Sequence, residues 1–159
     1  MGDLLAPAEP IGQGFGRIAN FINGELWGRP TEGPFGVIFC NDRIRSLYGS
    51  CPAGEVPRHA SQLYQAGLEG LVLFLVMLFV THRLKWLKRP GSVMGLFFVL
   101  YGVFRIVLEN VREPDEGLEN LPWGLTMGMA LSLPMVIGGV LLLLWAFRPK
   151  TAVPEANRA

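Results

Sequence analysis

The sequence predicts an all-α integral membrane protein: a helical bundle of three transmembrane helices with an N-terminal, partly embedded segment and an outer loop. Half of the 159 residues are apolar and only 17% are charged, and the apolar residues collect in three long blocks with the charges between them. A soluble protein instead carries charge along every surface helix. The formal net charge of +1 excludes a polycationic nucleic-acid binder and an acidic disordered chain. We expect one membrane domain over residues 1–159.

Three apolar blocks are long enough to cross a membrane, since about 20 residues cover a hydrocarbon core about 30 Å thick. They cover residues 63–80, 93–108 and 125–147. The first contains one charged residue, Glu69, the second contains Arg105, and the third contains none. Pro134 in the third block is tolerable in a membrane helix, because neighbouring helices can satisfy the freed backbone group.

The basic residues of the loops predict the orientation. Residues 81–90 carry five basic residues, His82 included, and no acidic one, whereas residues 110–123 carry four acidic residues against Arg112. By the positive-inside tendency, the basic loop and the tail at 148–159 are cytoplasmic, and the acidic loop is outside.

The chain before Leu63 is then expected to begin from the outer side, with an outer loop over residues 31–62. The N-terminal segment, residues 1–30, shows no basic region followed by an apolar core, so we expect no cleaved signal peptide.

The outer loop contains both cysteines, Cys40 and Cys51, eleven positions apart. In an oxidising exterior compartment they can form a loop disulfide, and two free, unrelated thiols are the alternative. Beyond Arg43 and Arg45, nothing nearby indicates a lowered thiol pKa, so neither cysteine is assigned a catalytic role.

The richest chemistry lies in residues 14–29. If the first half is helical, one stripe carries Gly16, Asn20, Asn23 and Trp27, with Arg17 beside them. The planar fork of an arginine can hold two phosphate oxygens while neighbouring amides donate to the others, which suits an anionic headgroup. The alternative is an interfacial arginine that reaches lipid phosphate on its own, with the asparagines as caps and turns.

A second group lies on the second apolar block, where Tyr101, Arg105 and Glu109 share one helix face by their i, i+4, i+8 spacing. Arg105 is then a second cation close to the outer interface, held by Glu109, with the Tyr101 hydroxyl below it. The alternative is a structural pair one helical turn apart, which contributes a few tenths of a kcal/mol in water. Ionisable residues inside membrane segments usually serve function, so we favour the first interpretation.

A third group, residues 57–65, enters the first apolar block from outside. His59 can accept or donate a proton near neutral pH. The alternative is that Arg58 and His59 anchor the chain at the interface and Ser61 caps the following helix. The sequence alone leaves both open.

These three segments resemble, in the same order, the motifs of the prolipoprotein diacylglyceryl transferases, the bacterial inner-membrane enzymes that begin lipoprotein maturation. The strings are GRIANFINGELWG at 16–28, PRHASQLY at 57–64 and YGVFRIVLE at 101–109. The resemblance extends over residues 3–147 and implies a multi-pass protein of the inner membrane, with its active site facing the periplasm and its C-terminus in the cytoplasm.

The resemblance implies transfer of a diacylglyceryl group from phosphatidylglycerol to the thiol of the lipobox cysteine in the signal peptide of a preprolipoprotein. It implies catalytic roles for Arg17, Asn20, Arg105 and Glu109. It implies substrate contacts for Arg17, Asn23, Glu25, Gly28, His59, Tyr101 and Arg105. We expect no metal, no organic cofactor and no nucleic-acid partner; the expected partners are the two substrates and membrane lipids.

The sequence also departs from this family. Ala19 stands where glycine is usual, Ala60 where proline is usual, and Gln65 where glutamate is usual. The family's first half, with about four further spans and a glycine-flanked histidine motif, has no counterpart here. Two hypotheses follow: a truncated transferase, active alone or completed by a separate chain that supplies the missing half, or a non-catalytic phospholipid-binding module or degenerate remnant.

Overall fold

The computed structural model of the protein describes residues 1–113 and 125–149. Within these residues the chain is helical and has no strand, although three isolated bridges join extended segments. The helices are α1 (Gly2–Leu5), α2 (Glu9–Asn23), α3 (Asp42–Tyr48), α4 (Ser61–Gln65), η1 (Ala66–Val72), α5 (Leu73–Leu78), η2 (Phe79–Arg83), η3 (Trp86–Lys88), α6 (Ser92–Glu109) and α7 (Met127–Ala146). The all-α prediction is confirmed for this part of the chain.

Within residues 1–113 and 125–149, three helices are long and apolar enough to cross a membrane. The first runs without a break from α4 through η2, over Ser61–Arg83, and the other two are α6 and α7. The three predicted spans are therefore confirmed by length and composition, with ends that differ by at most three residues from the predicted blocks. Part of the predicted acidic loop (114–124) and most of the predicted tail (150–159) lie outside the described residues.

Helix α2 ends at a glycine. Gly24 follows it in the left-handed conformation, with φ of 70°, and its backbone N–H closes the last turn onto Asn20 and Phe21. Glycine adopts this conformation without a steric penalty, which makes it a common helix terminator. Trp27 therefore lies beyond the helix, and the predicted stripe of Gly16, Asn20, Asn23 and Trp27 is wrong in its last member.

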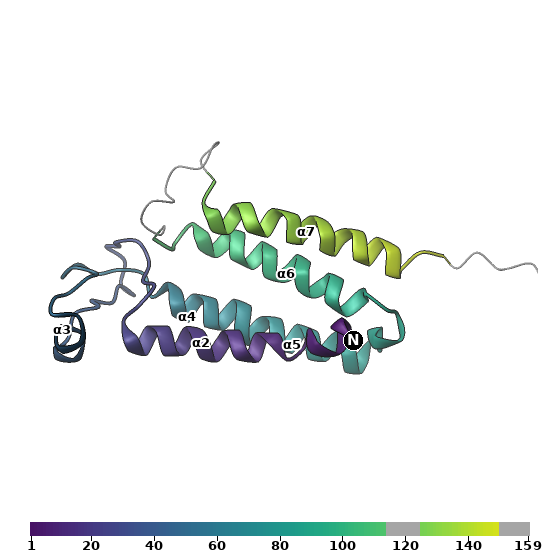
Figure 1. Cartoon of the computed structure of the whole chain (residues 1–159), viewed down its shortest axis with the longest axis horizontal. Helices are drawn as coiled ribbons and strands as arrows, with labels where there is room; N and C mark the ends of the chain where they lie inside the picture. The colour runs from purple at the N-terminus through teal and green to yellow at the C-terminus, as the bar shows by residue number, and fades with distance from the viewer. Residues whose placement is uncertain (114–124, 150–159) are drawn as a thin grey trace, which may run out of the picture.

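The N-terminal segment runs the whole length of α6. At one end, the Asp3 carboxylate accepts hydrogen bonds from the backbone N–H groups of Gly91 (2.7 Å) and Met94 (2.8 Å), at the start of α6. At the other end, Arg29 N donates to Val111 O (3.0 Å), just past the end of α6. Figure 1 shows α2 lying beside α4 and α5 over this distance, which is about 27 Å for an 18-residue helix.

The prediction that the chain before Leu63 begins from the outer side is therefore wrong for α1. This helix lies beside the basic loop at the opposite end of the bundle from the outer loop. The reason is that α2 passes along the first span in the opposite direction, an arrangement that charge counting does not reveal.

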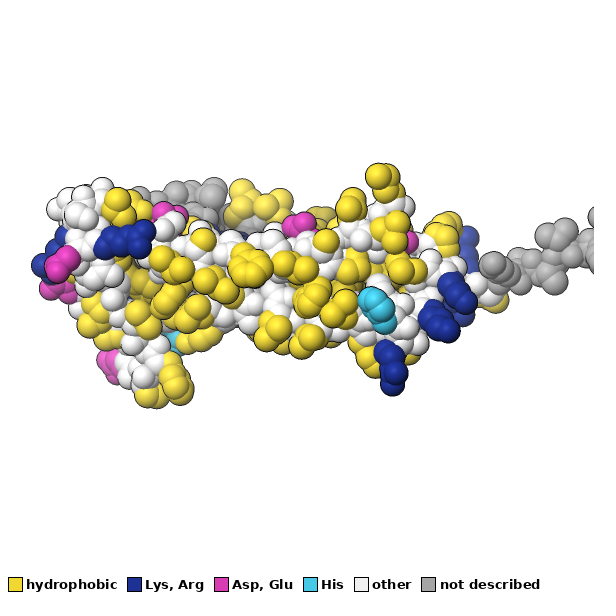
Figure 2. Space-filling view, turned by 90° about the horizontal axis from the view of Figure 1, so that it is seen from below, with side chains coloured by type: hydrophobic (Ala, Val, Ile, Leu, Met, Phe, Trp, Pro, Cys, Tyr) yellow, Lys and Arg dark blue, Asp and Glu magenta, His cyan; other side chains and the backbone are white. Residues whose placement is uncertain are grey.

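Glycines set how closely the helices approach one another. A Cβ on Gly70 of η1 would lie 2.7 Å from the Cα of Gly14 on α2, and a Cβ on Gly139 of α7 would lie 2.7 Å from the carbonyl oxygen of Gly95 on α6. Small residues of this kind allow backbone-to-backbone packing in membrane helices. Figure 2 shows apolar side chains covering the middle of the bundle, with charged side chains mostly toward its two ends.

The outer loop has a small core of its own and a disulfide. Phe39, Ile44, Ala53 and Ala60 form the buried cluster. Cys40 and Cys51 are bridged, with their Cα atoms 5.3 Å apart, which decides between the two alternatives that the sequence left open.

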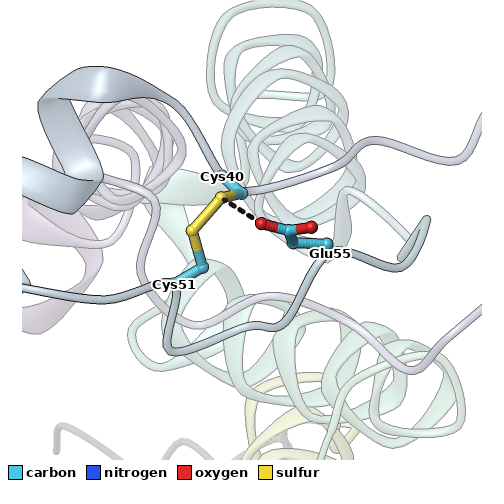
Figure 3. Close-up of side chains that lie close together, drawn as sticks. All are labelled: Cys40, Cys51 and Glu55. Carbon is cyan, nitrogen blue, oxygen red and sulfur yellow. Dashed lines mark hydrogen bonds between the residues drawn. A yellow bond between two sulfur atoms is a disulfide. The ribbon is translucent and has the colours of Figure 1, made fainter.

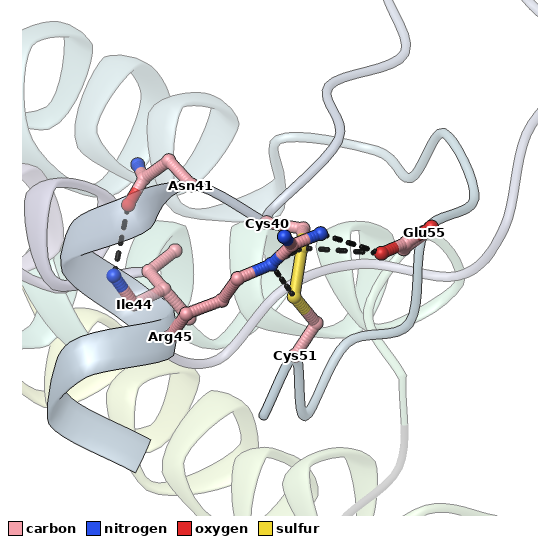
Figure 4. The surroundings of a disulfide bond; sticks show 6 residues. All are labelled: Cys40, Asn41, Ile44, Arg45, Cys51 and Glu55. Atoms are coloured by element: carbon pink, nitrogen blue, oxygen red, sulfur yellow. Dashed lines mark hydrogen bonds and ion pairs between the residues drawn. A yellow bond between two sulfur atoms is a disulfide. The ribbon is translucent and has the colours of Figure 1, made fainter. Parts of the chain in front are cut away.

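Charged side chains flank this bridge. The Glu55 carboxylate lies beside it (Figure 3), and Arg45 reaches from α3 across both sulfurs to Glu55 at 2.7 Å (Figure 4). Ligand atoms of Cys40, Cys51 and Glu55 lie within 4.8 Å of one another. Bridged sulfurs are not thiolates, however, and metal binding by cysteine requires the thiolate.

Candidate functional site

Four charged side chains from three helical elements meet inside the bundle, and we call them the arginine cluster: Arg17, Glu69, Arg105 and Glu109. Arg17 Nε lies 3.9 Å from Glu69 Oε2, and Arg105 Nη1 lies 3.9 Å from Glu69 Oε1. Arg105 Nε lies 3.8 Å from Glu109 Oε2. The predicted pairing of Arg105 with Glu109 is confirmed, and the two predicted arginines meet at one carboxylate.

Local backbone structure brings Arg17 to Glu69. Glu69 is the fourth residue of η1, a π-helical stretch of seven residues. The next residue, Gly70, is the one that lets α2 approach at Gly14. Arg17 follows Gly14 by three positions, close to one helical turn, so the closest approach of the two helices lies beside this ion pair.

Glu109 lies against the beginning of α7. A Cβ on Gly128 would lie 2.6 Å from Glu109 Oε2, and the Thr126 side chain caps this helix by accepting from Met129 N. The first turn of a helix carries partial positive charge. Glu109 is therefore placed between two positive partners, the guanidinium of Arg105 and the start of α7.

Among the described residues, nine buried polar atoms have no hydrogen-bond partner, and five of them belong to the arginine cluster. They are Arg17 Nε, Arg105 Nη1, both oxygens of Glu69, Glu109 Oε2, both amide atoms of Gln65, Gln62 Oε1 and His59 Nδ1. Nearly all buried polar groups in folded proteins are paired. A polar ligand that offers both acceptors and donors would account for the five unpaired atoms of the arginine cluster.

The two asparagines lie on the last two turns of α2. Asn20 is half-buried, one turn beyond Arg17, and its side-chain amide makes no hydrogen bond to another described residue. Asn23 is the last residue of the helix and is also half-buried. The structure thus keeps Asn20 close to the arginine cluster and places Asn23 nearer to the outer loop.

Gly28 and Glu25 lie outside the arginine cluster. A Cβ on Gly28 would lie 2.6 Å from Val111 O and 2.7 Å from His59 Cβ, so only glycine fits where these extended segments meet. The Glu25 carboxylate accepts a hydrogen bond from the Tyr48 hydroxyl of α3 at 3.0 Å. This hydrogen bond raises the pKa of Tyr48 above its ordinary value.

His59 and Tyr101 each pack against an aromatic ring. The His59 ring packs edge-on against Tyr64, with centroids 6.0 Å apart. Tyr101 stacks on Phe97 at 5.7 Å and lines a cavity of about 360 Å³ between α1, α2, α6 and α7. Tyr101 is one turn from Arg105 along α6, so this cavity begins directly beside the cluster.

The segment at 57–65 is partly structural. The Arg58 guanidinium pairs with the Glu113 carboxylate, which also accepts from Trp27 Nε1 at 2.9 Å. Ser61 is the first residue of α4 and donates to Leu26 O at 3.0 Å, whereas the cap position is Ala60. The alternative that Ser61 caps the helix is therefore wrong.

Sequence reasoning did not assign a role to Glu69 or Arg112. Glu69 carried a usable signal, because it is the only charge in the first apolar block, and such residues usually serve function. Arg112 is buried in the segment just beyond α6. Its burial follows from the bridge between its segment and Gly28, for which the sequence offers no signal.

Comparison with known proteins identifies the family. The prolipoprotein diacylglyceryl transferase model matches residues 1–145. The chain belongs to this family. Proteins named phosphatidylglycerol–prolipoprotein diacylglyceryl transferase are 63% identical over 151 residues in Phenylobacterium zucineum (strain HLK1), 57% over 158 residues in Caulobacter sp. (strain K31) and 47% over 156 residues in Pseudomonas aeruginosa (strain LESB58).

These matches cover 95%, 99% and 97% of this chain, but 52%, 52% and 53% of the three relatives. The chain therefore spans about half the length of the curated relatives it matches. With three helices apolar enough to cross a membrane, this member of the diacylglyceryl transferase family is a bacterial membrane protein.

Proposed function

We propose that this chain carries the phospholipid-handling part of a phosphatidylglycerol–prolipoprotein diacylglyceryl transferase. The observation that supports this most directly is the meeting of Arg17 and Arg105, from two different helices, at 3.9 Å from one buried carboxylate. Guanidinium forks bind phosphate oxygens with charge-assisted hydrogen bonds. The two arginines would hold the headgroup phosphate, and the apolar cavity beside Tyr101 would accommodate part of an acyl chain.

The reaction replaces a carbon–oxygen bond of the phospholipid by a carbon–sulfur bond. The sulfur of the lipobox cysteine attacks the glyceryl carbon that carries the phosphate, so a C–S bond forms as the C–O bond to phosphate breaks. Glycerol phosphate leaves with the bonding electron pair, and the thiol proton passes to it. Arg17 and Arg105 would stabilise the negative charge that develops on the leaving group.

Other side chains have supporting roles in this proposal. Asn20 would donate its free amide to a phosphate oxygen, and Glu109 would fix the orientation of Arg105. The remaining proposed substrate contacts, nearer the outer loop or along the cavity, are Asn23, Glu25, Gly28, His59 and Tyr101.

A second candidate function is a phospholipid-binding membrane module without catalysis. It would rest on the same two arginines and the same cavity, which can hold a phospholipid without catalysing its reaction. Transfer would use the half of the relatives that this sequence does not span, supplied in the same or in a separate chain.

A lipidation assay separates these functions. Membranes that contain the 159-residue chain are given phosphatidylglycerol and a preprolipoprotein, with or without the remaining half of a relative expressed as a separate chain. A mass increase of the preprolipoprotein by one diacylglyceryl group supports the transferase. No increase under either condition, together with retained binding of phosphatidylglycerol, supports the binding module instead.

The proposed orientation places the arginine cluster toward the periplasm and the C-terminus in the cytoplasm. The basic residues of the loop before α6 support it. In intact cells, an impermeant maleimide should label Gly33→Cys in the outer loop and not Lys85→Cys in the basic loop. The reverse pattern would invert the orientation.

A further inference from the structure

Glu69 lies at the centre of the arginine cluster, although it belongs to none of the three motif strings. It joins arginines from two separate helices, Arg17 of α2 and Arg105 of α6. We propose that Glu69 is a positioning residue, which holds the two guanidinium groups side by side so that together they present one binding site to a phosphodiester. This inference rests on the proposed function, because it takes the headgroup phosphate as the ligand.

Stability does not explain a carboxylate at this position. An ionised side chain inside a membrane segment carries a free-energy cost, and replacing a buried ion pair by apolar residues is often neutral or stabilising. Glu69 also lies within the π-helical stretch η1, and π-helical turns occur frequently at functional sites. Both observations favour a functional reason for this residue.

The three side chains differ in exposure, and this difference gives them different roles. The Glu69 side chain is 0% exposed, whereas those of Arg17 and Arg105 are each 14% exposed. A ligand would therefore meet the arginines and not the carboxylate. At 3.9 Å neither contact is a hydrogen bond, so Glu69 holds the two guanidinium groups electrostatically without occupying Arg17 Nε or Arg105 Nη1.

Loss of the Glu69 charge would leave two cations facing each other in a medium of low dielectric constant, where like charges repel strongly. The arginines would then separate. A role limited to balancing the charge of the arginines predicts the opposite effect on binding, since removing a negative charge strengthens the attraction for phosphate. The sign of the change in affinity therefore distinguishes positioning from simple charge balance.

The test is a calorimetric titration of the full 159-residue chain in dodecyl maltoside micelles with dihexanoyl phosphatidylglycerol. Dihexanoylglycerol, which lacks the phosphate, is the control ligand. We expect Glu69→Gln to raise the Kd at least about tenfold. Glu69→Asp, which keeps the charge but withdraws the carboxylate, should also raise it, by a smaller factor.

Two further variants test the mechanism. Glu55→Gln removes a carboxylate that also pairs with an arginine but is 70% exposed in the outer loop, and it should leave the Kd unchanged. On an Arg105→Gln background, the additional Glu69→Gln change should have little further effect, because Glu69 acts through the arginines.

Equal or tighter binding by a folded Glu69→Gln variant would overturn the positioning role and leave the proposed function standing. If that variant does not fold, as judged by its thermal melt, Glu69→Asp decides, and an unchanged Kd would overturn the role. Absence of phosphate-dependent binding by the unaltered chain would overturn both proposals.

Discussion

Two arginine–glutamate pairs of this protein differ in their exposure and in the distance between their charged groups. In the outer loop, Arg45 and Glu55 are both exposed and lie at a hydrogen-bonded distance of 2.7 Å. In the bundle, Glu69 is buried and the Arg17 side chain is 14% exposed; the two lie 3.9 Å apart, with unpaired atoms on both sides. The short exposed pair is hydrogen-bonded within the protein, whereas the long pair keeps unpaired polar atoms, as the proposed headgroup site requires.

The contrast shows that a short distance is a poor guide to importance. Exposed ion pairs contribute about 0–1 kcal/mol, because water screens them and two long side chains must be ordered. A buried pair without hydrogen bonds is costly to maintain, so its presence indicates a use other than stability. The predictions below test this difference, beginning with the largest expected effect.

Arg105→Lys should reduce diacylglyceryl transfer on the order of a thousandfold in an enzyme that also contains the remaining half of a relative, since removing one charge-stabilising donor costs that much in other enzymes. An ammonium cannot make the two parallel hydrogen bonds of a guanidinium. The lipidation assay measures the effect. Arg45→Lys in the outer loop is the matched control and should keep full activity; unchanged turnover of Arg105→Lys would make Arg105 an anchor only.

Asn20→Ala should reduce transfer on the order of a hundredfold, because one donor to the phosphate is lost. Expression and membrane insertion should be intact, since the side chain makes no hydrogen bond to another described residue. Asn110→Ala is the control: this exposed amide donates only to carbonyl groups of its own helix. Equal loss of activity in both variants would point to a general effect of amide removal.

Gly70→Ala should destabilise the bundle by about 2 kcal/mol, the usual range for overpacking a tight contact. The added methyl would lie 2.7 Å from Gly14 Cα and push α2 away from η1. Thermal unfolding in detergent measures the change. Gly16→Ala, on an open face of α2 with no neighbouring atom within 4 Å, should cause no loss; equal melting temperatures for the two variants would contradict the close approach.

Glu55→Gln should change the free energy of unfolding by no more than about 0.5 kcal/mol, as expected for an exposed pair. Thermal unfolding at low and high salt measures it, and the small difference from the unaltered chain should vanish at high salt. A large, salt-independent loss would show that the outer pair carries more of the loop's stability than its exposure suggests.

The parts of this structure that the sequence predicted are those encoded locally. Long apolar blocks define the three spans, and the i, i+4 spacing is enough to pair Arg105 with Glu109. The meeting of Arg17 with Glu69 depends on a contact between helices about 50 residues apart in the chain, set by two glycines whose relation appears only in the fold. The burial of Arg112 and the direction of α2 are non-local in the same way.

The segments on either side of α2 are hydrogen-bonded to the two ends of α6. Asp3 fixes one end to the first turn of α6, and Arg29 fixes the other to the segment beyond it. Between these two attachments helix α2 contains Gly12, Gly14 and Gly16, and glycine has a low helix propensity. Any widening of the space around Arg17 therefore requires α2 to bend at its middle, where the three glycines lie, and not at its two tethered ends.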